Sequence, residues 1–346
     1  MQTFARFVFM QCIRPIYVKN SDVRIASGEP VWHPVPCGKC LFCRKNKQQD
    51  WAFRQYAESL NPVHKSLFFV TLTIDDDHLV RNRYGRYSVY KSSLQDFFDR
   101  LRYYLPEGHN LRYMACGEYG DTFSRPHYHF NAFLDVDMTE DEFHLACTKA
   151  WKFCIPDELI VEPFDLKSAE YVAKYCTKRP GVDYDKNKVN SPFLLASRRP
   201  AIGKYWLDTQ HAKLHQSLLK TLVYDSSGTP YNMPRYLREK LFSDDDKLLL
   251  TKINEQARQD MFEFKAFQSG LSVDQVEDAL HLSGLSAEST ALKAAEFKKI
   301  QLDFLSERFQ VDKVTVSKFT CEDTEVRGMT VPPLSPSADI PVNEDF

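Results

Sequence analysis

No stretch of the sequence approaches the roughly 18 consecutive apolar residues that a membrane-spanning helix requires. The apolar run at the start is bracketed by Arg6 and Gln11 and is not followed by small residues of a cleavage site, so we expect no signal peptide. The nine cysteines are an odd number without the regular spacing of a secreted disulfide framework. No Gly-rich loop ending in Lys-Ser/Thr occurs, and no internal repeat is visible. These absences exclude membrane proteins, disulfide miniproteins and repeat arrays.

The composition is that of an ordinary globular protein, with 43% hydrophobic and 27% charged residues in 346 positions. This length accommodates two domains, or one elaborated domain with appendages. The net charge of -2 hides an asymmetry: residues 1–240 carry 34 Lys and Arg against 27 Asp and Glu, whereas residues 241–346 carry 11 against 20. The basic part is compatible with a nucleic-acid partner, although such an excess is more often a solvated surface.

The hydrophobic pattern predicts one α+β domain in the middle of the chain. Alternating apolar residues indicate strands, apolar residues at helical spacing indicate helices, and Thr139 followed by Glu142 is a capping box. The resulting order is β-α-β-β-α-β, typical of a ferredoxin-like or RRM-like antiparallel sheet with helices on one face. The expected elements are strand 66–74, helix 91–105, strands 111–118 and 127–134, a helix from Thr139 to Trp151, strand 159–164 and helix 168–178.

The flanking segments differ in character. A helix is expected at 46–60, and beyond residue 240 three helical patterns are separated by Gly270 and Gly284. The Pro- and Ser-rich end is expected not to pack. We therefore predict four parts: a Cys-rich segment and helix at 1–65, the α+β domain at 66–240, an acidic helical region at 241–330 and a disordered tail at 331–346.

His127 and His129 form a candidate metal-binding pair. Residues two apart share a face of a strand, and here Tyr128 and Phe130 would occupy the core face instead. Glu118 ends the preceding strand, and a hairpin would bring it beside the imidazoles as a third ligand for a divalent ion. The alternatives are an incidental His-x-His pair and a surface glutamate.

Tyr171 and Tyr175 are four residues apart on the helix expected at 168–178, so both hydroxyls would emerge from one face, with Lys174 between them. Tyrosines at this spacing are most often core residues. Glu170, Lys174 and Lys178 make this helix too polar for full burial, and therefore an exposed tyrosine pair calls for another explanation.

Cys37, Cys40 and Cys43 are spaced like ligands of a zinc site, with Pro36 and Gly38 making the turn. Cys12 or His33 could complete a tetrahedron. A bacterial-type iron–sulfur run would need a fourth cysteine soon afterwards, but position 47 is Lys. Arg44 and Lys45 follow at a helix start, where cations are disfavoured unless a zinc thiolate or a DNA phosphate offsets them. The alternative is a set of reduced, buried cysteines.

Four segments in order resemble the motifs of the HUH (His-hydrophobic-His) endonucleases. They are TLT at 71–73, GEYG at 117–120, RPHYHF at 125–130 and YVAKYCTK at 171–178. The paired tyrosines and the upstream PCGKCLFCR resemble the replication initiators of the Microviridae, particularly the gokushovirus branch. The resemblance covers roughly residues 35–205 and implies nothing about residues 241–346.

The resemblance implies a rolling-circle replication initiator with the HUH type of antiparallel sheet. His127, His129 and Glu118 would bind Mg²⁺ or Mn²⁺, Tyr171 and Tyr175 would be the nucleophiles, and Lys174 the cation between them. One tyrosine would nick a single strand at the origin, forming a 5′-phosphotyrosine and a 3′-OH primer. The second would allow the displaced strand to be rejoined into a circle.

Several expectations about partners follow. The substrate would be single-stranded or unwound origin DNA in the cytoplasm of the bacterial host, with a host helicase and polymerase as further partners and no membrane. The side chains expected to contact DNA are Arg44, Lys45, Lys47, Arg125, Lys178 and Arg179. Zn²⁺ would be structural. The rival interpretations are a plasmid-type initiator or relaxase with the same chemistry, and a non-enzymatic zinc-containing nucleic-acid-binding protein.

Overall fold

The computed structural model describes residues 12–24, 30–79, 81–120, 125–153, 158–175 and 189–283, together with two short strands, β10 (Glu325–Val326) and β11 (Met329–Thr330). The chain divides into two units: Met1–Gly120 with Ser124–Ala295, and Asp121–Phe123 with Glu296–Phe346. Strands β10 and β11 pair with each other in the second unit. Within the described ranges, no helix has the length and apolar character needed to cross a membrane.

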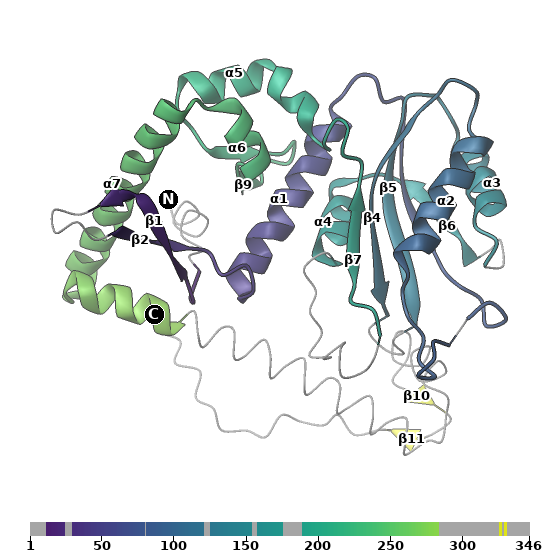
Figure 1. Cartoon of the computed structure of the whole chain (residues 1–346), viewed down its shortest axis with the longest axis horizontal. Helices are drawn as coiled ribbons and strands as arrows, with labels where there is room; N and C mark the ends of the chain where they lie inside the picture. The colour runs from purple at the N-terminus through teal and green to yellow at the C-terminus, as the bar shows by residue number, and fades with distance from the viewer. Residues whose placement is uncertain are drawn as a thin grey trace. The chain divides into compact units, whose positions relative to one another are not determined.

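A five-stranded antiparallel sheet forms the centre of the first unit, with the strand order β6-β3-β5-β4-β7 (Figure 1). The predicted β-α-β-β-α-β order is confirmed for the segment from β3 to β6. Strand β7, which no sequence pattern predicts, adds a fifth strand beside β4. The strands are β3 (Ser66–Leu72), β4 (Leu111–Tyr119), β5 (Pro126–Leu134), β6 (Ile160–Pro163) and β7 (Phe193–Ala196).

One face of the sheet carries the main hydrophobic core. Strand β3 alternates as predicted, and its buried Phe68, Val70 and Leu72 pack under helices α2 (Lys91–Tyr104) and α3 (Glu140–Ala150). The capping box is confirmed, because the Thr139 side chain accepts from the backbone of Glu142 and the Glu142 side chain accepts from the backbone of Thr139. Burial of these apolar side chains, at about 25 cal/mol per Å² of apolar surface, is the main force holding α2 and α3 on the sheet.

The opposite face is also covered by helices, so the expectation of helices on one face is incomplete. Helices α1 (Leu41–Ser59) and α4 (Leu166–Tyr175) pack together on this side, and α4 contacts β4 and β5 (Figure 1). The side chains of His129 and Asn131 on β5 are therefore buried, with exposed fractions of 5% and 0%. The polar residues of a strand predict a solvent-exposed sheet face, although here that face is an interface.

The N-terminal part begins with a hairpin of β1 (Ile16–Arg24) and β2 (Pro30–Val35). Helix α1 starts at Leu41, five residues before the predicted start, because the Cys40 side chain caps it by accepting a hydrogen bond from Cys43 N.

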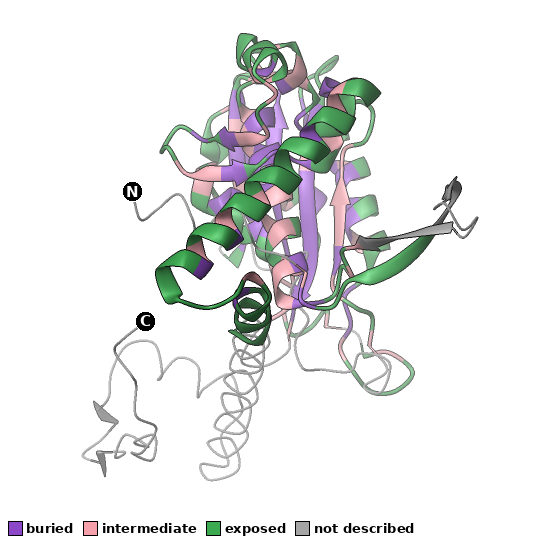
Figure 2. Cartoon of the chain, turned by 90° about the vertical axis from the view of Figure 1, so that its left-hand side faces the viewer, coloured by how far each residue is buried: buried purple, intermediate pink, exposed green. Residues whose placement is uncertain are grey.

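The C-terminal part of the first unit consists of short elements and one long helix. A second apolar cluster joins Phe53 of α1 to Trp206, Tyr231 and Leu237. Helix α7 is exposed over most of its length, whereas the sheet strands are largely buried (Figure 2). The elements are η3 (Lys204–Asp208), α5 (Gln210–Ser217), β8 (Leu222–Tyr224), β9 (Pro230–Asn232), α6 (Arg235–Leu241) and α7 (Asp244–Ser269).

Residues 273–283 are also helical, so two of the three helical patterns expected beyond residue 240 are confirmed. The third pattern and the tail at 331–346 lie outside the described residues.

Candidate metal and tyrosine site

The hairpin of β4 and β5 brings the three predicted metal ligands to one end of the sheet. Glu118 pairs with His127 across the hairpin, and His129 lies between Cys116 of β4 and Thr71 of β3. Because alternate residues share a face, both imidazoles and the carboxylate lie on the α1 and α4 side. Glu118 Oε1 is 3.1 Å from His129 Nε2, and both of these side chains are buried.

The hydrogen bonds of the two imidazoles orient them as ligands. His127 Nδ1 lies 2.8 Å from the carbonyl oxygen of Arg125, which can only accept, so Nδ1 carries the hydrogen and Nε2 carries the lone pair. His129 Nδ1 lies 3.0 Å from Thr71 Oγ1. A metal-binding histidine commonly donates its other ring nitrogen in this way.

Burial keeps both imidazoles in the form that binds metal. It lowers the pKa of His127, and it lowers the pKa of His129 to about 4. Both rings are therefore neutral at pH 7, and a neutral imidazole offers a lone pair to a metal ion.

The fit to a divalent ion is good at two of the three positions. The rings of His127 and His129 are nearly parallel, at 8°, with centroids 6.5 Å apart. Among the described residues, the ligand atoms of His127, His129 and Glu118 do not gather within 4.8 Å of one another, whereas those of the cysteine cluster do. Binding an ion would therefore require His127 to approach the His129–Glu118 pair. Carboxylate and imidazole donors with open positions suit a divalent ion that also binds substrate.

Tyr171 of α4 stands next to this pair. Its ring lies 5.1 Å from the His129 ring and 5.7 Å from Phe69, edge-on to both. The side chain is 37% exposed, so it is neither a core tyrosine nor fully solvated. Lys174 is exposed on the same helix. Tyr175 is the last residue of α4, one turn beyond Tyr171, and its side chain lies outside the described part.

A buried polar clamp fixes α4 against the sheet. Asn131 Nδ2 donates to Gln55 Oε1 at 2.6 Å and to the carbonyl oxygen of Ser168 at 3.3 Å. Gln55 Nε2 donates to the carbonyl oxygen of Ala169 at 2.9 Å. The clamp joins β5, α1 and the first turn of α4, which positions Tyr171. Strand alternation predicts Asn131 on the histidine face, but no sequence pattern points to its partner Gln55.

The first turn of α4 has a cap of its own. Ser168 N donates to Asp165 Oδ1 at 2.6 Å, and Asp165 N donates to Ser168 Oγ at 3.1 Å. The small buried residues Ala169 and Ala173 then allow close packing of the helix.

The residues expected to contact DNA are spread over several elements. Arg44, Lys45 and Lys47 lie in the first two turns of α1. Arg125 precedes β5, and its guanidinium donates to Asp76 Oδ1 at 2.7 Å and to the carbonyl oxygen of Ile74. Arg125 therefore also ties the segment after β3 to the start of β5. Lys178 and Arg179 lie outside the described residues.

Four cysteines form the second candidate site. The Sγ atoms of Cys12, Cys37, Cys40 and Cys43 all lie within 4.8 Å of one another. The backbone N–H groups of Lys39 and Cys40 donate to Cys37 Sγ, which lowers the pKa of Cys37 to about 6, whereas burial raises the pKa of Cys43. Such a closed set of four thiols could bind zinc. Of the two fourth ligands considered, Cys12 is present; the side chain of His33 lies outside the described part.

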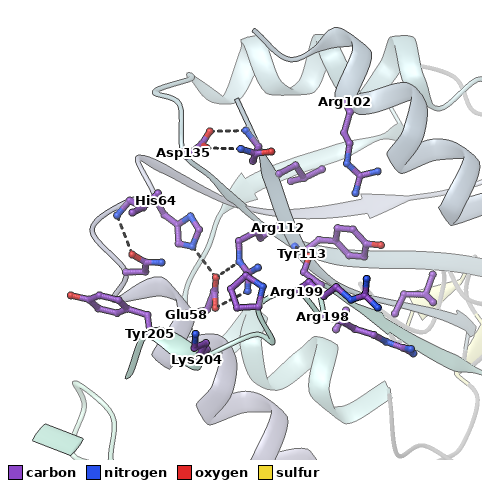
Figure 3. A pocket seen from close by; sticks show the side chains of 18 of the residues that line it. Glu58, His64, Arg102, Arg112, Tyr113, Asp135, Arg198, Arg199, Lys204 and Tyr205 are labelled. Carbon is purple, nitrogen blue, oxygen red and sulfur yellow. Dashed lines mark hydrogen bonds and ion pairs between the residues drawn. The ribbon is translucent and has the colours of Figure 1, made fainter. Parts of the chain in front are cut away.

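A polar cavity of about 1060 Å³ lies at the other end of β4 (Figure 3). Its lining includes Arg102, Arg112, Arg198, Arg199 and Lys204, against Glu58, Asp135 and Asp208. The sequence alone did not predict this cavity. The Arg198-Arg199 pair before Pro200 was its only local signal, because the other residues come from distant segments.

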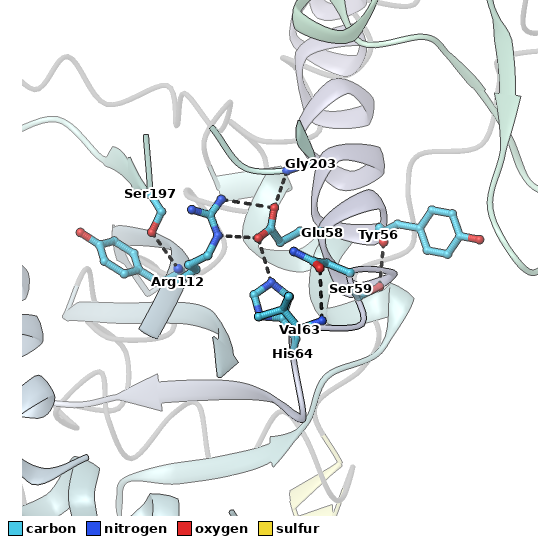
Figure 4. Close-up of polar contacts among 10 residues, drawn as sticks. Tyr56, Glu58, Ser59, Val63, His64, Arg112, Ser197 and Gly203 are labelled. Atoms are coloured by element: carbon cyan, nitrogen blue, oxygen red, sulfur yellow. Dashed lines mark hydrogen bonds and ion pairs between the residues drawn. The ribbon is translucent and has the colours of Figure 1, made fainter. Parts of the chain in front are cut away.

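Glu58 forms the floor of that region as a buried hub (Figure 4). Arg112 donates to it from Nε at 2.5 Å and from Nη2 at 3.3 Å, Gly203 N donates at 2.7 Å, and His64 Nε2 lies at 2.9 Å. Burial alone would raise the pKa of Glu58, but these partners lower it to about 2. Glu58 thus joins the end of α1 to β4 and to the turn at Gly203.

Similarity to known proteins extends over most of the chain. Residues 67–180 match the family described as Replication-associated protein ORF2, a segment that runs from β3 through α4. The chain is 28% identical over 304 residues to Replication-associated protein ORF2 of Spiroplasma virus 4, covering 78% of this chain and 93% of that protein. It is 30% identical over 253 residues to Replication-associated protein VP4 of Bdellovibrio phage phiMH2K, covering 66% and 76%.

A third relative, Replication-associated protein ORF4 of Chlamydia phage 1, is 28% identical over 236 residues, which cover 62% of this chain and 56% of that protein. No solved structure matches. The resemblance to phage replication proteins is thereby confirmed, and the chain belongs to the Replication-associated protein ORF2 family.

Proposed function

We propose that this protein initiates rolling-circle replication of phage DNA by nicking one strand at the origin and later rejoining it. The observation that carries the proposal is the position of Tyr171, whose ring lies 5.1 Å from His129, while His129 is hydrogen-bonded to Glu118. A phenol, two imidazoles and a carboxylate that meet beside a clamped helix suit a phosphoryl-transfer site better than a binding surface. The HUH type of site is part of this proposal.

The residues act in separate roles. His127, His129 and Glu118 would hold Mg²⁺ or Mn²⁺, which when bound polarises the scissile phosphate and stabilises its developing negative charge. The oxygen of Tyr171 attacks phosphorus, the bond from phosphorus to the 3′-oxygen breaks, and a phosphotyrosine ester forms. The phenolic proton leaves to solvent and the departing 3′-oxygen takes up a proton. Lys174 adds positive charge on the tyrosine helix.

Tyr175 would serve the joining step. It lies one turn after Tyr171 on α4, so the two tyrosines are about 6 Å apart along the axis. One tyrosine would hold the displaced strand while the other cuts the regenerated origin, and the new 3′-OH would close the circle by attacking the old ester. The 3′-OH left by the first cut would be a primer for a host polymerase, after a host helicase unwinds the duplex in the cytoplasm.

Covalent attachment to DNA tests the proposal. The purified chain is incubated with single-stranded circular phage DNA and Mg²⁺ or Mn²⁺, and adducts are counted on a denaturing gel. We expect Tyr171→Phe with Tyr175→Phe to abolish adducts, and each single variant to retain some. Tyr103→Phe, on the exposed side of α2, is the matched control and should behave as the unchanged chain. Adducts that persist in the double variant would show that α4 does not carry the nucleophile.

The metal assignment has its own test. His127→Ala should remove divalent-dependent nicking while thermal unfolding stays the same, because His127 is only half-buried and bonds a single carbonyl oxygen. Full activity in His127→Ala would reject this ligand set.

A non-enzymatic zinc-containing nucleic-acid-binding protein is the second candidate, favoured by the four clustered thiols. It predicts DNA binding without adducts under any divalent ion, so the same gel distinguishes the two.

A further inference from the structure

We propose that the cavity at the far end of β4 is a second DNA-binding groove, which holds the phosphate backbone away from the cut site. This inference rests on the proposed function, since it assumes a DNA substrate. The groove is defined by Arg112, Tyr113, Arg198, Arg199, Lys204 and Tyr205 (Figure 3).

Charge is the first property of the groove that favours DNA. Arg112 is neutralised by Glu58, and Arg102 is paired with Asp99 at 2.9 Å. In contrast, none of the described carboxylates forms an ion pair with Arg198, Arg199 or Lys204, and all three side chains are exposed. Three cations without carboxylate partners around one cavity attract a polyanion, and the planar guanidinium binds phosphate oxygens in pairs.

The mixture of cations and aromatic rings is the second. Tyr113 stacks on Phe98 with ring centroids 3.7 Å apart, and both Tyr113 and Tyr205 line the cavity. Basic grooves that carry aromatic side chains bind single strands through phosphate contacts and base stacking. An acidic peptide would satisfy the charges but would leave the rings without a role.

The third is the position of the groove relative to the metal ligands. Arg112 and Glu118 lie on the same strand and the same face, six residues and therefore roughly 20 Å apart. Edge strand β7 runs between the two ends, since Phe193 pairs with Gly117 and Ala196 with Met114. A DNA strand that follows β7 at about 3.4 Å per nucleotide would reach the groove about six nucleotides from the cut.

Binding of a fluorescein-labelled (dT)30 to the full chain tests this groove. Anisotropy is measured at several salt concentrations without added divalent ion, so cleavage is not needed. We expect Arg198→Gln with Arg199→Gln to weaken binding about tenfold at about 0.15 M salt, and to lower the slope of log K against log salt by about 1.4. Lys204→Gln alone should lower the slope by about 0.7. Thermal unfolding should be unchanged for these exposed positions.

Lys252→Gln with Lys265→Gln on α7 removes the same charge away from the groove, and we expect it to keep the affinity and slope of the unchanged chain. The proposal is overturned if the arginine variant matches this control. It is also overturned if polyglutamate of equal charge loses binding in the arginine variant while (dT)30 does not, since the groove would then bind a protein. Failure of the proposed function would appear separately, as absence of adducts with the unchanged chain.

Discussion

His129 is held by a different partner at each ring nitrogen. Nδ1 lies 3.0 Å from Thr71 Oγ1 and Nε2 lies 3.1 Å from Glu118 Oε1. The Thr71 hydroxyl, on the neighbouring strand, therefore sets the ring orientation without touching substrate. TLT at 71–73 belongs to the segments that resemble the HUH motifs, and the hydrogen bond gives Thr71 a physical role there.

Thr71→Val tests this positioning role. Valine keeps the shape but removes the hydroxyl, so His129 loses one of its two orienting partners. Loss of such a partner typically costs about 10–100-fold in metal affinity or activity. We expect the Mg²⁺ or Mn²⁺ concentration for half-maximal adduct formation to rise by about that factor, with adducts recovering at high metal. Thr73→Val, on the same strand segment, is the control. A purely structural role would lower the melting temperature and would not be rescued by metal.

At the scale of elements, helix α1 is fixed at both of its ends. Cys40 caps its first turn inside the thiol cluster, and Glu58 anchors its last turn to β4. Because α1 also carries Gln55, which holds α4, the order of the thiol cluster bears on the placement of Tyr171.

Zinc content and stability test the cluster. We expect about one zinc per chain by elemental analysis, and Cys37→Ser should lose it and unfold at lower temperature, because zinc binding adds directly to folding free energy. Cys147→Ser, a buried cysteine under α3 and outside the cluster, should keep its zinc even if it is destabilised. Absence of zinc from the unchanged chain would return the four thiols to reduced, buried cysteines.

Local patterns were sufficient for the elements from β3 to α4, and for the pairing of Glu118 with His127, because strand alternation and hairpin connection are properties of neighbouring residues. Strand β7 was missed because its four residues, Phe193–Ala196, form an uninterrupted run of apolar residues without alternation. The clamp between Asn131 and Gln55 joins residues 76 apart, and the groove gathers several segments. No local pattern encodes either of them.

At the scale of the whole unit, Glu58 connects segments that are far apart in the sequence. Arg112 lies 54 residues from it and Gly203 lies 145 residues from it. Breaking one partner of a buried ion pair usually costs about 3–5 kcal/mol, since the other charge remains buried. The hub should therefore contribute to the stability of α1, β4 and the turn at Gly203 together.

Acid titration of Glu58→Gln tests this contribution. The partners lower the pKa of Glu58 from 4.5 to about 2, so the folded state binds the proton less readily than the unfolded chain. The stabilisation is complete above pH 4.5 and is lost as the pH falls through 2. The difference in unfolding free energy between the unchanged chain and Glu58→Gln should thus shrink by about 2 kcal/mol from about pH 5 to about pH 3, measured by urea unfolding. Glu239→Gln, which removes an exposed ion pair with Lys247, should cost less than about 1 kcal/mol at about pH 5. A Glu58→Gln difference that stays constant over this pH range would show that the hub is not an ionised carboxylate.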